Sequence, residues 1–80
     1  MAARPISPAA KTFGQRVRAR RLELGWSQEE AARRCEVHWT FLGQVERGQR
    51  NLSLHNILKL AKGLDADPGD LVAGLKAPRL

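Results

Sequence analysis

The sequence predicts an all-α domain of five helices, and three observations lead to this class. Apolar residues recur at intervals of three and four along most of the chain, which is the spacing of one helix face. Capping residues and helix breakers divide the chain into segments of helical length. No alternation of apolar and polar residues competes as a strand. At 80 residues we expect one domain, whose small core leaves little room for a buried, multi-step active site.

The first helix is expected over about residues 12–24, after a flexible tail over residues 1–10. The tail contains two prolines and several small residues without helical periodicity. Phe13 and Val17 share one side of the helix, and Thr12 is the expected N-cap. Its other sides carry arginines, which are either an ordinary solvated surface or contacts to an anionic partner; they are Arg16, Arg18 and Arg20.

Two short helices follow, over about Gln28–Arg34 and Trp39–Arg47, and a tight turn joins them. Ser27 suits the N-cap of the first because its hydroxyl can accept a backbone N–H, and Glu30 completes a capping box. Gly48 can take the left-handed conformation that ends the second. Small or apolar residues stand where the two helices must touch; they are Ala32, Val37, Leu42 and Val45. A short helix presented in this way suits insertion into a DNA major groove.

Two more helices complete the domain, which we place at residues 11–75, with a second flexible tail at 76–80. Ser53 caps a helix that runs to about Leu64. Its expected core-facing stripe consists of Leu54, Ile57, Leu58 and Ala61. Asp67 and Pro68 suit the start of the fifth helix, on which we place Leu71, Val72 and Leu75.

Charge and cysteine content narrow the class of partner and the compartment. Lys and Arg number 14 against 8 Asp and Glu, and the net charge of +6 favours an anionic partner. A single cysteine excludes an intramolecular disulfide and a cysteine-based zinc site, which points to a reducing cytoplasm. No apolar run approaches the roughly 20 residues that a membrane helix needs, so we expect no membrane contact.

Enzyme chemistry is not expected. His38 and His55 fall on different helices without a nearby group of acids, and Cys35 is expected to be a small buried residue. The sequence has no glycine-rich phosphate loop and no pair of metal ligands at helical spacing. We therefore expect no cofactor and no metal.

The pattern from Gln28 to Gly48 resembles the helix-turn-helix of the phage-repressor and Cro-like (Xre-type) DNA-binding domains. Gln28 opens the first motif helix, Ala32 follows at its fifth position, and Val45-Glu46-Arg47-Gly48 ends the second. The small controller proteins of restriction-modification systems are similar in His38–Gly43 and Glu46–Asn51. The family often has Gly where Glu36 stands here, so a turn with positive φ would cost on the order of 1 kcal/mol. The resemblance implies a lambda-repressor-like fold and a bacterial or phage transcription regulator.

Position on the second motif helix suggests which side chains meet double-stranded DNA. Residues at the start of this helix, and one turn later, are candidates for base edges; they are His38, Trp39, Thr40 and Gln44. Trp39 could instead pack on a neighbouring helix. Gly43, in the helix interior, indicates close approach to DNA or to another helix.

The resemblance also implies contacts with the DNA backbone. Gln28 corresponds to a residue that contacts a phosphate or an outer base, and the segment after the recognition helix contacts phosphates through Arg47, Gln49, Arg50 and Asn51. Simple turn chemistry is the alternative for Arg50 and Asn51. Arg4 and Lys11 could make the first tail an arm in the minor groove, with a flexible terminus as the alternative.

Two structural expectations remain. The resemblance implies an ion pair between Arg21 and Glu46. The fifth helix spreads its apolar residues over too wide an arc for one core, so Leu71, Val72 and Leu75 favour a homodimer. Such a regulator would block or recruit RNA polymerase at an operator. The alternative is a protein-binding module, such as an antitoxin, with secondary DNA binding.

Overall fold

The computed structural model describes residues 4–79, which contain five α-helices. Their bounds are α1 Pro8–Glu23, α2 Gln28–Cys35, α3 Trp39–Glu46, α4 Leu54–Gly63 and α5 Pro68–Val72. The all-α, five-helix prediction is therefore confirmed. Residues 1–3 and 80, which belong to the two expected tails, lie outside the described residues.

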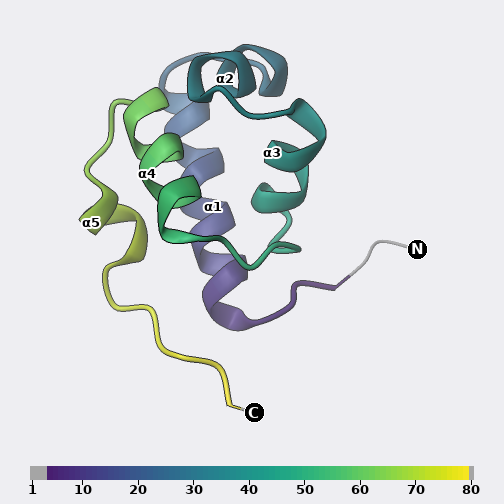
Figure 1. Ribbon diagram of the computed structural model, residues 1–80, viewed down its shortest axis with the longest axis vertical. Coiled ribbons are helices and arrows are strands. Elements are labelled where there is room, and N and C mark those ends of the chain that lie inside the picture. The colour runs from purple at the N-terminus through teal and green to yellow at the C-terminus, as the bar shows by residue number, and fades with distance from the viewer. Residues whose placement is uncertain (1–3, 80) are drawn as a thin grey trace.

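The helices surround α1, which is the longest of the five (Figure 1). α2 crosses one end of α1, and α3 packs against both of them. α4 packs against α2 and α5, and α5 packs back onto α1. Within the part of the chain that the structure describes, no helix is long and apolar enough to cross a membrane.

The first helix begins at Pro8, so the expected start near Thr12 is wrong and residues 8–10 are helical. The N-cap is Ser7, whose hydroxyl accepts a hydrogen bond from the Ala10 backbone N–H at 3.0 Å. Pro8 occupies the first turn, where its missing N–H costs nothing and its φ is already suitable. This serine–proline pair is the start signal that the sequence interpretation overlooked.

The turn between α2 and α3 has a positive φ at Glu36, the position where the family resemblance raised that question. Glu36 has φ 56° and ψ 41°, in the left-handed region, and it caps the end of α2. Gly48, which has φ 74°, ends the recognition helix α3 as expected. Left-handed residues thus stand in the turn and at the end of the helix-turn-helix.

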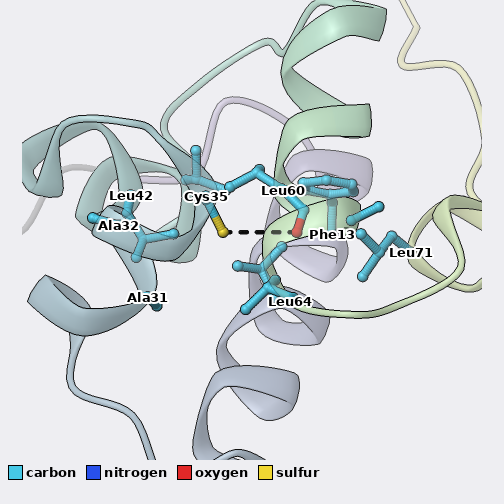
Figure 2. Packing of buried hydrophobic residues seen from close by; sticks show 11 residues of the cluster. Phe13, Ala31, Ala32, Cys35, Leu42, Leu60, Leu64 and Leu71 are labelled. Atoms are coloured by element: carbon cyan, nitrogen blue, oxygen red, sulfur yellow. Dashed lines mark hydrogen bonds between the residues drawn. The ribbon is translucent and has the colours of Figure 1, made fainter.

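The core lies between α1, α2 and α4, with contributions from α3 and α5 (Figure 2). Leu42, Leu60 and Leu64 are completely buried. The Cys35 thiol donates a hydrogen bond to the Leu60 backbone carbonyl at 3.7 Å, and burial raises the pKa of the thiol to about 11. Cys35 therefore behaves as the small buried residue that the sequence suggested.

The stripe expected on α4 is partly wrong. Leu54 is 68% exposed and Leu58 44% exposed, whereas Ala61 is buried as expected. The core face instead includes Leu60 and extends to Leu64, just after the helix. The helical spacing of leucines fits more than one face, and contact with α2 selects the face that is buried.

Two arginines of α1 bind backbone carbonyls rather than pointing away from the domain. Arg16 Nη1 donates to the Leu71 carbonyl at 3.2 Å and to the Ala73 carbonyl at 2.7 Å. Arg20 donates from Nε to the Leu64 carbonyl at 2.9 Å and from Nη2 to the Asp65 carbonyl at 3.0 Å. These guanidinium groups satisfy carbonyls at the ends of α4 and α5.

The fifth helix ends at Val72 and is therefore shorter than expected. Leu75 lies beyond it in a turn, where its backbone N–H donates to the Val72 carbonyl at 3.1 Å. Gly74 has φ 74°, which turns the chain away from the helical direction. Leu75 is therefore not a residue of α5, although it still packs against the core.

Candidate nucleic-acid interface

The recognition helix α3 is held by a buried polar network. Arg21 of α1 and Glu46 of α3 form two hydrogen bonds, from Nε to Oε2 at 2.7 Å and from Nη2 to Oε1 at 2.9 Å. The two side chains are only 9% and 3% exposed, and the Glu46 carboxylate raises the pKa of Arg21. Arg21 Nη1 also donates to the Trp26 carbonyl at 2.9 Å. The expected pair is thus a bidentate contact that ties α3 to α1 and to the segment before α2.

Gln28 belongs to the same network. Its Nε2 donates to Glu46 Oε1 at 3.1 Å, so the amide links the start of α2 to the end of α3. Sequence reasoning placed Gln28 at the DNA surface but missed this bond. The amide keeps a second N–H on Nε2, and the first backbone N–H groups of a helix have no partner within the helix.

The start of α3 is exposed and carries the residues expected to reach bases. His38 is the N-cap, and its Nδ1 accepts a hydrogen bond from the Thr40 backbone N–H at 3.1 Å. The His38 and Trp39 rings are stacked, with their centroids 6.3 Å apart. Trp39 is 55% exposed, so it does not pack into the core. Thr40 is also exposed, and Gln44 is half-buried one turn later.

The segment after α3 carries further polar side chains. Arg47 is exposed, and its Nε donates to Gln49 Oε1 at 3.2 Å. The Arg50 guanidinium lies over the Phe41 ring, 4.9 Å from its centroid, which holds this exposed cation against α3. Asn51 is exposed at the end of the segment.

The N-terminal segment packs against the end of α3. The Ile6 backbone N–H donates to the Gly48 carbonyl at 2.8 Å. A Cβ on Gly48 would lie 2.9 Å from the Lys11 Cα and 3.0 Å from the Pro5 Cβ. No local pattern revealed this contact, because its two sides are separated by the whole helix-turn-helix. Exposed Arg4 adjoins this contact along the chain.

Surface ion pairs also occur on α2, outside the buried network. Glu30 accepts hydrogen bonds from Arg33 and Arg34, which lower the pKa of its carboxyl group. The Arg34 guanidinium also lies 4.9 Å from the centroid of the Trp26 ring. These arginines therefore stabilise the first motif helix.

The three residues expected to form the dimer contact differ in their exposure. Leu71 is buried at 3% exposure, Val72 is 40% exposed, and Leu75 is half-buried. Val72 and Leu75 line an open apolar hollow of about 360 Å³. The hollow is also lined by Ile6, Phe13 and residues of the α3–α4 connection.

Comparison with known proteins identifies similar chains. Residues 17–71 match a family model described as helix-turn-helix. Control protein C.BamHI of Bacillus amyloliquefaciens is 48% identical over 61 residues, which is 75% of each chain. The restriction-modification controller protein C.AhdI from Aeromonas hydrophila, known from a crystal structure, has 50% sequence identity to this chain and a TM-score of 0.75. The comparison covers 78% of this chain and 94% of the C.AhdI chain.

A third similar protein was crystallised with its ligand. The biofilm regulator SinR in complex with DNA has a TM-score of 0.70 and 32% identity to this chain. The comparison covers 74% of this chain and 95% of the SinR chain.

Proposed function

Because this chain belongs to the helix-turn-helix family, we propose that it regulates transcription as a homodimer on a two-fold symmetric operator. It is a DNA-binding regulator of the family that includes restriction-modification controller proteins. The assignment of individual residues, the dimer and the contact with RNA polymerase are the parts that we propose here. The observation that carries the residue assignments is a recognition helix whose end is anchored by the buried pair of Arg21 and Glu46 and whose start is exposed.

We assign base recognition to the start of α3. Thr40 offers a hydroxyl and a methyl group to base edges, and Gln44 offers an amide. Trp39 provides apolar contact with thymine methyl groups or with a sugar, and it is exposed enough to do so. His38 holds the first turn through its Nδ1, which leaves its other ring nitrogen for DNA.

We assign phosphate contacts to the ends of the motif. Arg47 and Arg50 supply charge, and Gln49 and Asn51 supply polar groups on the same segment. Gln28 contributes from the start of α2 through its remaining N–H. These contacts set affinity and register but read no sequence.

A matched pair of variants tests this division of roles. Thr40→Ala should weaken binding to the site selected from a random DNA pool by about 1–3 kcal/mol and should change binding to random duplex little. Arg47→Ala should weaken both, and should reduce the slope of log K against log salt by about 0.9. Fluorescence anisotropy over a salt series measures both quantities.

The result can contradict the proposal in two ways. Equal losses on both DNAs for Thr40→Ala would show that this residue reads no base. If the wild-type protein does not bind DNA at low salt, or binds it with an affinity that does not depend on salt, the DNA-binding role is contradicted.

The dimer is proposed from the accessible apolar residues beside α5. Val72 and the hollow next to it expose apolar surface that a second copy would cover. A two-fold axis there would place two recognition helices in successive major grooves, about 34 Å apart. The preferred site should then be an imperfect palindrome.

Val72→Asp should abolish pairing and weaken operator binding while the fold is retained, because an exposed side chain is replaced. Sedimentation velocity with and without operator DNA measures the mass. Leu22→Asp is the matched control, since Leu22 is an exposed apolar residue at 53% exposure on α1. A wild-type monomer in both conditions, together with a selected site that lacks symmetry, would contradict the dimer.

We further propose that the operator-bound dimer acts in the cytoplasm, at the nucleoid, where it blocks or recruits RNA polymerase. Reporter transcription from a promoter that carries the selected site would give the sign of the effect.

A further inference from the structure

Gly43 occupies a position in α3 where the fold does not require a glycine. Its φ is not positive, and the atoms that a Cβ would meet belong to side chains rather than to another backbone. Alanine is more favourable than glycine in a helix interior. Of the two close approaches that Gly43 suggested in the sequence, contact with another helix is therefore not the reason for this glycine.

The space beside Gly43 is occupied by the end of Arg47. A Cβ on Gly43 would lie 3.2 Å from Arg47 Nη1 and 3.7 Å from Gln28 Oε1. Arg47 follows Gly43 by one helical turn, and long side chains on a helix point back toward its start. The guanidinium thus lies along α3 in the place of the missing side chain, next to the Gln28 amide.

Neighbouring groups restrict Arg47 and Gln28 further. Arg47 Nε donates to Gln49 Oε1 at 3.2 Å, and Gln28 Nε2 is bound to Glu46 at 3.1 Å. Arg47 therefore has a packing site against α3 and a hydrogen-bond partner before any DNA is present, although it is an exposed side chain. A side chain that is already ordered loses less conformational entropy on binding.

We propose that Gly43 is a positioning residue for DNA binding, because the space that it leaves holds the Arg47 guanidinium ready for a backbone phosphate. This inference rests on the proposed function. Gly43 contacts no DNA in this arrangement and acts through Arg47.

A double-mutant cycle with Gly43→Ala and Arg47→Ala tests the inference. Gly43→Ala should keep or raise stability to urea, since only the flexible end of Arg47 has to move. Its affinity for random duplex should fall about two- to tenfold, the effect of ordering one side chain on binding. The salt slope should be unchanged, because displaced Arg47 can still reach the phosphate. In the Arg47→Ala background, Gly43→Ala should have no effect on affinity.

Each other outcome overturns the inference. An unchanged affinity for Gly43→Ala would mean that Arg47 needs no positioning. An equal loss in both backgrounds would mean that the added methyl group meets DNA directly. A marked loss of stability would mean that more than Arg47 has to move. Failure of wild-type protein to bind DNA is a separate result, which removes the proposed function and this inference together.

Discussion

Replacing Glu46 by alanine should lower the free energy of unfolding by about 3–5 kcal/mol. The substitution leaves the Arg21 guanidinium buried without its carboxylate, and Gln28 loses its acceptor as well. Because Glu46 lies on the recognition helix, the remaining folded protein should also bind operator DNA more weakly. Urea unfolding of the purified variant measures the loss of stability.

Two control variants separate the effect of losing the buried ion pair from the effect of removing a charged side chain. Glu30→Ala removes a carboxylate that pairs with Arg33 and Arg34 at the surface, and it should leave the melting temperature nearly unchanged. The double variant Arg21→Met with Glu46→Leu should recover much of the stability, because apolar side chains can replace a buried ion pair. A small effect of Glu46→Ala, comparable to that of Glu30→Ala, would show that solvent reaches the pair.

Gly14→Ala should destabilise the protein by about 3 kcal/mol, although alanine normally favours a helix. Gly14 is buried where α1 crosses α3, and a Cβ there would lie 2.2 Å from the Val45 carbonyl oxygen and 2.8 Å from that of Glu46. Both atoms belong to the backbone of the recognition helix, so the two helices would have to separate. The midpoint of urea unfolding should fall accordingly.

Gly43→Ala is the matched control for Gly14→Ala, because it makes the same change in a helix interior. There the added atom would meet only side-chain ends, so stability should be kept or raised. If both variants are as stable as the wild type, the crossing of α1 and α3 is looser than the structure indicates.

The local signals in the sequence predicted much of this protein. Ser27 and Gly48 act within one or two turns of the chain, and the structure has the cap and the helix end that they indicated. The five-helix class followed from the same kind of signal. The family pattern also indicated that Arg21 and Glu46 would meet, and their side chains lie in contact.

The roles of the arginines could be decided only by the tertiary structure. Arg16, Arg18 and Arg20 look alike in the sequence, but Arg16 and Arg20 bind carbonyls more than 40 positions away, whereas Arg18 is exposed. A guanidinium on a helix can be exposed to solvent, bind a phosphate, or donate hydrogen bonds to the carbonyls at the end of another helix. The choice depends on which carbonyls the packing of α5 and the end of α4 brings within its reach.

The functional surface divides in the same way. The sequence alone determined which segment is the recognition helix and which residues stand at its start, since these depend on periodicity and caps. Tertiary structure decided that Gln28 binds Glu46, that Arg47 lies over Gly43, and that Leu54 and Leu58 are exposed. These outcomes depend on distances between helices, and a pattern within one helix carries no information about the position of the next.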